Sequence, residues 1–266
     1  MDGPDADARQ LNGQPYRPDG GGGSGILAVS RATYRGRLPE RYDDYPASFR
    51  APFDRAVAGV IGPGQRVLDV GGGRTATVPP DQRPPGCSYA GLDILGTELE
   101  LAPAGSYDEL IVGDISRRQP ELVGGFDLIV SFQMLEHVDG LDRAVVNMVD
   151  YLRPGGHLVA QLSGSFSSYS LISRLVPHSV ARRIQSRLYG REPDTVFPAH
   201  YDRCYASALR RMIPAGVSAD IVPLWIAAPY FKFSRTLQSA YIAYEEWARR
   251  GGRANLAPYY LLTVRK

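Results

Sequence analysis

The stretch Val67-Leu-Asp-Val-Gly-Gly-Gly73 decides the fold class. Three apolar residues around a single aspartate run directly into three glycines, which is typical of a buried parallel strand that ends in a ligand-binding turn. Outward from this stretch, further strands are predicted over residues 88–92, 109–112, 126–130, 157–161, 219–224 and 259–264. Helices are predicted over residues 34–60, 141–152, 207–212 and 237–249. Short strands that alternate with helices predict a doubly wound α/β domain.

The composition is that of an ordinary globular protein. Of 266 residues, 44% are hydrophobic and 22% are charged, which provides enough apolar material for a sizeable core. A net charge of +2 gives no electrostatic case for a nucleic-acid partner. Cys87 and Cys204 are too few for a disulfide scaffold, and no apolar run is long enough to predict a membrane span. We therefore expect a reduced, cytoplasmic protein.

Glycines and acidic residues stand where the predicted strands end. Residues 71–73 let the backbone approach a ligand without a Cβ in the way. Asp93 ends the next strand about twenty residues further on, where a carboxylate can hold both hydroxyls of a ribose, although it can also simply cap a helix. Asp114 ends the third strand and can accept a hydrogen bond from an adenine amino group. We therefore expect a cofactor that contains adenosine.

The type of cofactor depends on Asp69. Residues 71–76 also match the G-x-G-x-x-A fingerprint of dinucleotide-binding proteins, which by itself is weak evidence. A carboxylate beside the glycine turn repels a pyrophosphate but suits S-adenosylmethionine, which carries a sulfonium, an ammonium and no phosphate. The chain also has no Tyr-x-x-x-Lys pair for hydride transfer. These features favour S-adenosylmethionine over a nicotinamide.

Six short motifs, in order, resemble those of class I S-adenosylmethionine-dependent methyltransferases, in particular the type 11-like methyltransferase domain. The motifs are Val67-Leu-Asp-Val-Gly-Gly-Gly73, Gly91-Leu-Asp93, Gly113-Asp-Ile115, Phe126-Asp-Leu-Ile-Val-Ser131, Leu135-Glu-His-Val138 and Leu152-Arg-Pro-Gly-Gly156. The resemblance is strongest over residues 50–165. It implies a Rossmann-like, mostly parallel seven-stranded sheet, with a helical lid inserted after the fifth strand.

The resemblance also implies which residues contact the cofactor along its methionine, ribose, adenine and inner-wall sides. These are, in chain order, Asp69, Gly71, Gly72, Gly73, Asp93, Ile94, Asp114, Ile115, Ser131 and Gln133. One departure from the family pattern is visible. Thr75 stands in place of the third glycine, and Pro79-Pro80 follow it, which predicts a short or distorted first helix.

Two histidines are candidate catalytic residues. Methyl transfer to a hydroxyl needs an aligned donor and acceptor, and it benefits from a general base. His137, which follows the fourth strand, is the first candidate, and its structural alternative is to orient the loop of Glu136. His200, where the chain returns from the predicted lid, is the second candidate. The acidic residues are scattered at strand ends, so we expect chemistry without a metal.

The chain divides into five predicted parts. They are a disordered N-terminal tail at 1–24, N-terminal helices at 25–60, a cofactor-binding core at 61–162, a helical substrate lid at 163–199 and the remainder of the core sheet at 200–266. The lid combines an apolar set at helical spacing with many arginines. This pattern is typical of a solvated cap over the site, or of a basic amphipathic surface for a membrane or a phosphorylated acceptor.

The expected function is methyl transfer to a small molecule, as O-methylation of a sugar, a glycolipid or a secondary metabolite. A lipid-linked or phosphorylated saccharide suits the lid, and a peripheral membrane contact and a homodimer stay open. One alternative is a non-catalytic partner protein that kept the fold. Another is a protein or nucleic-acid methyltransferase, although Ser131-Phe-Gln-Met134 replaces the Asn/Asp-Pro-Pro-aromatic motif typical of base-methylating enzymes.

Overall fold

The computed structural model describes residues 47–167, 170, 201, 203–231 and 234–266. The predicted tail at 1–24, the first part of the predicted N-terminal helices, most of the predicted lid at 163–199 and His200 lie outside the described residues. All seven predicted strands lie within the described ranges, as does the helix predicted between the last two of them.

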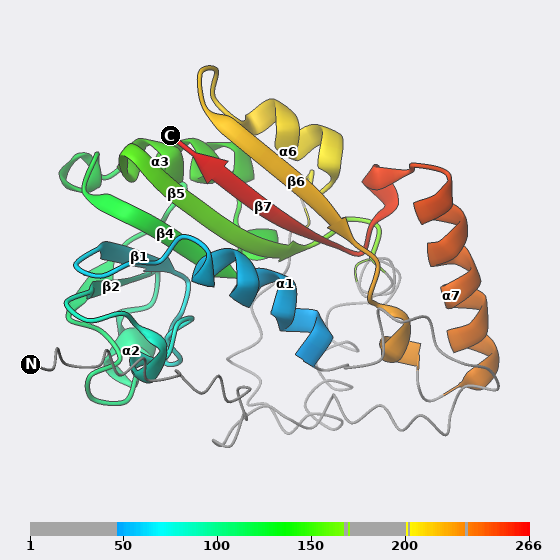
Figure 1. Ribbon diagram of the computed structural model, residues 1–266, viewed down its shortest axis with the longest axis horizontal. Coiled ribbons are helices and arrows are strands. Elements are labelled where there is room, and N and C mark those ends of the chain that lie inside the picture. The colour runs from blue at the N-terminus through cyan, green and yellow to red at the C-terminus, as the bar shows by residue number, and fades with distance from the viewer. Residues whose placement is uncertain (1–46, 168–169, 171–200, 202, 232–233) are drawn as a thin grey trace, which may run out of the picture.

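A seven-stranded sheet forms the centre of the molecule (Figure 1). Its strands are β1 (Arg66–Val70), β2 (Ser88–Asp93), β3 (Glu109–Val112), β4 (Phe126–Phe132), β5 (Leu152–Ser163), β6 (Ser218–Leu224) and β7 (Tyr259–Arg265). Their order is β3-β2-β1-β4-β5-β7-β6. Of these strands, β7 alone runs in the opposite direction to the other six. The sequence prediction of a doubly wound, mostly parallel sheet is confirmed.

Helices cover both faces of this sheet. The α-helices are α1 (Ala47–Ala58), α2 (Gly96–Glu100), α3 (Leu141–Tyr151), α6 (Ala206–Met212) and α7 (Arg235–Arg250). Short 3₁₀ helices are η4 (Pro80–Gln82), η5 (Pro120–Leu122), η6 (Leu135–His137), η8 (Ala228–Phe231) and η9 (Ala254–Leu256). The apolar faces of α3 and α6 join one large core cluster, and Phe53 and Val57 of α1 join a second cluster on the opposite face.

The segment between β1 and β2 contains no α-helix. This segment, residues 71–87, holds only the 3₁₀ helix η4, so no α-helix forms where a short or distorted one was predicted. Ala76 and Val78 of the loop are buried in the core cluster of α1, beside Phe53. An irregular loop therefore supplies the apolar contacts that a crossover helix provides in a regular βαβ unit.

Several element boundaries differ from the sequence prediction, that of β5 the most. β5 begins at Leu152 rather than at His157, because residues 152–156 join the strand as an irregularity where the register against β4 shifts. α6 begins at Ala206, with Tyr205 as its N-cap, and the Ser207 backbone N–H donates to Asn255 Oδ1 at 2.8 Å.

Two long connections leave the sheet at the edge where β1 ends. β5 and β6 run parallel to β1, so the chain leaves both strands at this edge, after Ser163 and after Leu224. The second connection carries α7, which lies beyond the end of the sheet (Figure 1). Within the described ranges, no helix has the length and apolar character needed to cross a membrane.

Candidate functional site

The glycine loop after β1 makes the sharp turn that the sequence predicts. Gly71 and Gly73 have φ values of 77° and 55°, in the left-handed region that favours glycine. The Gly71 backbone N–H donates to the Leu92 carbonyl at 2.8 Å, which ties the loop to the end of β2. The side chain of Met134 occupies the space where a Cβ on Gly71 would lie. The loop therefore runs between the ends of β2 and β4.

Asp69 holds this loop from beneath. Its carboxylate is fully buried and accepts hydrogen bonds from the Thr77 N–H and hydroxyl, both at 2.6 Å, and from the Tyr89 hydroxyl at 3.0 Å. Burial raises the pKa of Asp69 to about 6, although these hydrogen bonds oppose the shift. A side chain with no exposed surface offers none to a ligand. Asp69 therefore shapes the loop, in place of the predicted contact with methionine.

Two residues that the sequence did not single out complete the support of the loop. The Tyr107 hydroxyl donates to the Gly73 carbonyl at 3.0 Å, and its ring stacks on Tyr89 with 5.9 Å between the ring centroids. A guanidinium nitrogen of Arg50, from α1, donates to the Thr77 carbonyl. Burial, more than any other effect, raises the pKa of Tyr89 and of Tyr107. Both hydroxyls therefore keep their protons and remain donors at neutral pH.

Gly72 has no room for a side chain. A Cβ at this position would lie 2.4 Å from the Tyr107 hydroxyl and 2.6 Å from an Asp69 carboxylate oxygen. Both atoms are already fixed by hydrogen bonds to the loop. The glycine is therefore required by close packing beneath the loop.

Asp93 faces the glycine loop from the end of β2. Its Oδ1 accepts from the Leu95 N–H at 3.0 Å. Burial raises the pKa of Asp93, and the Glu98 charge adds to the shift, while hydrogen bonds from Leu95, Ile94 and Gly73 N–H groups lower it. The neighbouring Ile94 is 59% exposed. A half-buried carboxylate between partly exposed glycine backbone and an exposed apolar side chain fits the ribose and base of an adenosyl group.

Arg74 bridges the glycine loop and α2. Its guanidinium donates to both carboxylate oxygens of Glu98, at 2.8 and 2.7 Å. A Cβ on Gly73 would lie 3.7 Å from both the Asp93 Oδ2 and the Glu98 Cβ. The Arg74–Glu98 ion pair therefore lies next to Gly73 and Asp93. The bidentate pair closes one side of the site.

The end of β3 forms a tight turn around Asp114. Its Oδ1 accepts from the Ser116 N–H at 2.8 Å, while Ile115 is buried with 4% of its surface exposed. The Ile115 carbonyl accepts from the Asn147 amide at 2.7 Å, which anchors the turn to α3. The predicted adenine-binding residues therefore stand on a turn fixed by α3, and their contact with adenine stays a prediction.

The two predicted residues at the end of β4 have different positions. Ser131 is fully buried, and its hydroxyl donates to the Val70 carbonyl at 3.0 Å, so its side chain links β4 to β1 and does not line the site. Gln133 is partly exposed, has a left-handed φ of 54°, and accepts from the Ser163 hydroxyl at 2.7 Å. Of the two, Gln133 alone has side-chain surface to present to a ligand.

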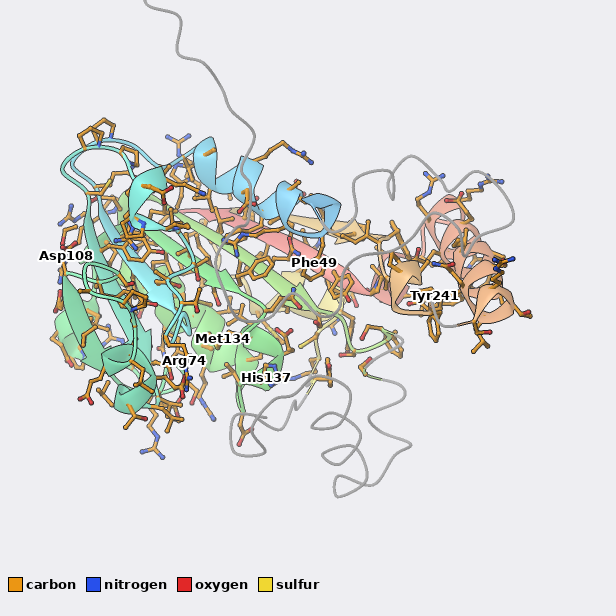
Figure 2. All side chains as sticks on the ribbon, turned by 90° about the horizontal axis from the view of Figure 1, so that it is seen from below. Phe49, Arg74, Asp108, Met134, His137 and Tyr241 are labelled. Atoms are coloured by element: carbon orange, nitrogen blue, oxygen red, sulfur yellow. The ribbon has the colours of Figure 1, made fainter. Side chains whose placement is uncertain are left out.

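His137 lies beside the return of the chain from the predicted lid. The Tyr201 backbone N–H donates to the Glu136 carbonyl at 3.0 Å, so the residue after His200 contacts the residue before His137. In Figure 2, Arg74, Met134 and His137 lie along one edge of the molecule. The turn that carries His137 is therefore bonded to Tyr201, and His200 lies outside the described residues.

The carboxylate of Glu136 points inward from the same turn. Its side chain is 3% exposed, and burial raises its pKa, while the charge of His137 and hydrogen bonds from Ser163 oppose the shift. Across the described ranges, no group of three or more His, Cys, Asp or Glu residues is placed to hold a metal ion. The turn after β4 thus carries a buried carboxylate at Glu136 beside the partly exposed imidazole of His137.

Replacing Asp69 with Asn removes the titration of the buried carboxyl. Because the folded-state pKa of about 6 lies above the unfolded value near 3.8, the carboxyl contributes stability below about pH 4 that is lost as pH rises through about 6. Urea denaturation should show the stability of the wild type, relative to Asp69→Asn, falling by roughly 3 kcal/mol between about pH 4 and pH 7. Parallel curves for the two proteins would contradict this role.

Gly72→Ala places a methyl group against two fixed oxygens. We expect a loss of about 1–3 kcal/mol in the free energy of unfolding, which is typical of overpacking. Gly62→Ala is the matched control, because its Cβ would meet nothing closer than 3.7 Å. Thermal denaturation of both variants measures the difference. Equal stability of the two would show that the loop relaxes freely.

Comparison with known proteins places the chain in a family. A family model described as "Methyltransferase domain" matches residues 34–212, which is more than half of the chain. No curated protein sequence matches significantly. The family match includes the glycine loop, Asp93, Asp114 and His137, the positions around which the site is built.

Several solved structures are similar to this one. An S-adenosylmethionine-dependent methyltransferase from Mesorhizobium loti has 18% identity and a TM-score of 0.46, over 82% of this chain and 97% of that one. A geranyl diphosphate methyltransferase has 16% identity and a TM-score of 0.48, over 81% and 77%. Phosphoethanolamine N-methyltransferase 2 from Haemonchus contortus has 13% identity and a TM-score of 0.45, over 81% and 52%. By its family match and its sheet, the chain belongs to the methyltransferase domain family with the class I S-adenosylmethionine-dependent fold.

Proposed function

We propose that this protein transfers the methyl group of S-adenosylmethionine to a hydroxyl of a small molecule, such as a sugar, a glycolipid or a secondary metabolite. Membership of the methyltransferase domain family supports the reaction class. The geometry around Gly73 and Asp93 supports the cofactor, because a carboxylate, partly exposed glycine backbone and the apolar Ile94 lie together there.

The observation that carries a small-molecule acceptor is where the 163–199 segment starts and ends. At its start, the Ser165 N–H donates to the Cys204 carbonyl at 2.8 Å, and the Ser165 hydroxyl donates to the Tyr201 carbonyl at 2.8 Å. At its end, Tyr201 donates to Glu136. Both ends of the segment are therefore fixed to each other and to the turn that carries His137. Such an arrangement suits an enclosed acceptor better than an extended polymer.

The described residues can be assigned separate roles in the proposed reaction. S-adenosylmethionine, when bound, supplies an activated methyl group with a neutral thioether as leaving group. The loop of Gly71 and Gly73, held by Asp69, positions the donor side, and Asp93 orients it by hydrogen bonds. His137 accepts the proton of the acceptor hydroxyl as its oxygen forms the new bond to carbon. Positioning of this kind supplies several kcal/mol of the barrier.

Calorimetry tests the cofactor first, and product analysis then tests the acceptor. Titration of the protein with S-adenosylmethionine, S-adenosylhomocysteine and NADH should give micromolar binding of the first two and none of the third. Incubation with nucleotide sugars, glycolipids and phenolic metabolites should then yield methyl ethers, detected by mass spectrometry. Cofactor binding without turnover of any hydroxyl compound would favour a protein or nucleic-acid acceptor. An absence of binding would favour a non-catalytic partner.

Asp93→Ala removes the carboxylate assigned to the ribose. We expect the affinity for S-adenosylmethionine to fall by about 1–3 kcal/mol, which is the cost of losing hydrogen bonds to a charged group. Isothermal titration calorimetry measures this change, and Asp81→Ala, at an exposed position on η4, is the control. Equal affinity of Asp93→Ala and wild type would exclude the ribose assignment.

His137→Ala removes the proposed base. Turnover should fall by about 10²-fold or more, with nearly unchanged affinity for S-adenosylmethionine, because the imidazole acts on the acceptor. His157→Ala is the control, since His157 lies within β5 opposite Leu128. Steady-state kinetics and calorimetry separate the two effects. A parallel loss of turnover and cofactor affinity would instead indicate that His137 orients the turn.

A further inference from the structure

The two edges of the central sheet differ in how they are protected. β6 forms one edge, and it contains Pro223, which has no backbone N–H to offer to a further strand. β3 forms the other edge, and of the described strands β2 alone pairs with it. β3 contains no proline, and its register against β2 is regular. Its outer N–H and C=O groups are therefore free to pair with another strand.

Exposed apolar side chains gather at the β3 edge. Ten large hydrophobic side chains are exposed among the described residues, and five of them lie within the stretch 94–112. Leu110 and Val112 of β3 are 48% and 63% exposed. Leu95 and Leu101, at the two ends of α2, are 39% and 61% exposed. These four residues form the β3 edge patch, and such a concentration is typical of an interaction surface.

The β3 edge patch lies on the face of the sheet that α2 covers. Leu110 lies beside Gly91 of β2, and a Cβ on Gly91 would meet a side-chain carbon of Leu99 of α2 at 2.9 Å. Val112, two residues after Leu110, points to the same side of the sheet. A Cβ on Gly96, the first residue of α2, would lie 3.0 Å from a methyl carbon of Val112. The patch therefore runs from β3 onto α2.

We propose that two copies of this chain pair antiparallel through their β3 strands, about a twofold axis at Ile111. A twofold axis perpendicular to the sheet keeps the α2 faces of both copies on the same side. With the axis at Ile111, Leu110 of each copy lies opposite Val112 of the other copy, and every residue of β3 is paired. The exposed apolar side chains then cover one another, and Glu109 lies opposite Gly113 instead of a like charge.

Charge at the ends of β3 favours a second copy as the occupant. The Glu109 carboxylate is already paired with Arg66 of its own chain at 2.7 Å. Asp108, exposed just before β3, comes next to the turn after β3 in the other copy. On this turn the Arg117 side chain is 86% exposed, and it is only 3.6 Å from the Asp114 carboxylate of its own chain, beyond hydrogen-bond distance. The symmetry brings a carboxylate and a guanidinium together at both ends of the paired strands.

The dimer leaves the candidate site open. Antiparallel pairing reverses the second copy, so the edges at which β1 ends face opposite directions in the two copies. Figure 2 shows Asp108, next to β3, and Tyr241 of α7 at opposite ends of the molecule, so α7 lies far from the paired strands. The contact adds an assembly to the proposed function and does not cover the glycine loop.

The size of the contact sets its strength. Standard interfaces bury about 1,200–2,000 Å² in total, and a strand of four residues covers less than this. Leu95 and Leu101 extend the apolar contact beside the strand. We therefore expect a reversible dimer with a dissociation constant on the order of 10 µM.

Sedimentation equilibrium of the full chain tests this dimer. Wild type should associate reversibly, and Val112→Glu should weaken the association by about tenfold or more, because it places a charge against an apolar side chain. Val222→Glu, on the β6 edge at a position 38% exposed, is the matched control and should associate as wild type does. A wild type that stays monomeric at about ten times the expected dissociation constant overturns the proposal. Equal weakening by the two variants also overturns it.

A charge pair tests the register. Leu110→Arg alone should weaken the association as Val112→Glu does. In an equimolar mixture of the two variants, the mixed dimer has the guanidinium opposite the carboxylate at one contact and the original apolar pair at the other. The mixture should associate about tenfold more tightly than either variant alone. A mixture as weak as its components overturns the antiparallel register.

Hydrogen exchange tests the contact without any substitution, so it decides the matter even if Val112→Glu fails to fold. Peptides that cover residues 109–113 should exchange more slowly above the dissociation constant than below it, because pairing protects the outer N–H groups of β3. Peptides that cover residues 218–224 of β6 should exchange equally at both concentrations. Exchange of the β3 peptides that does not change with concentration overturns the proposal.

Discussion

The buried carboxylate of Asp69 is the interaction on which the site depends. In a regular βαβ unit the chain after the glycine turn is held by the hydrogen bonds of a helix, and here residues 71–87 contain no α-helix. Asp69 replaces part of that support by binding Thr77 twice and Tyr89 once. Because burial raises the pKa of this carboxyl, the shape of the loop is coupled to a group whose charge is costly to keep.

In the proposed function, the sheet separates the binding of the donor from the binding of the acceptor. The glycine loop, Asp93 and Asp114 follow β1, β2 and β3, on one side of the strand order, whereas the inserted segments follow β5 and β6 on the other. The end of β4, with Gln133, Glu136 and His137, lies between them. Under the proposed function, substitutions in the segments after β5 and β6 alter the acceptor and leave the strand ends assigned to the cofactor unchanged.

The fold was predictable from the sequence because each strand is a short apolar run bounded by glycine, proline or an acid. The hydrogen-bond partners that hold the glycine loop could not be predicted, because they are far away in the sequence. Tyr89 lies 20 residues from Asp69, Tyr107 lies 34 residues from Gly73, and Arg50 lies 27 residues from Thr77. No local pattern identifies partners at such separations, although a tyrosine in a buried strand does require one. Ser131 is the opposite case. Its position in the motif suggested a ligand contact, whereas its hydroxyl donates a hydrogen bond to the Val70 carbonyl.

The distant partners of the glycine loop have a consequence for how the chain folds. The loop accepts hydrogen bonds from Arg50 of α1, which precedes it, and from Tyr107, which follows it, and it donates one to Tyr89 of β2. It can take its final shape only after β1 and β2 have paired and α1 has docked, because contacts of long sequence separation form at a high cost in chain entropy. The ligand-binding surface is thus acquired late in folding, and a bound ligand stabilises the step that completes the domain.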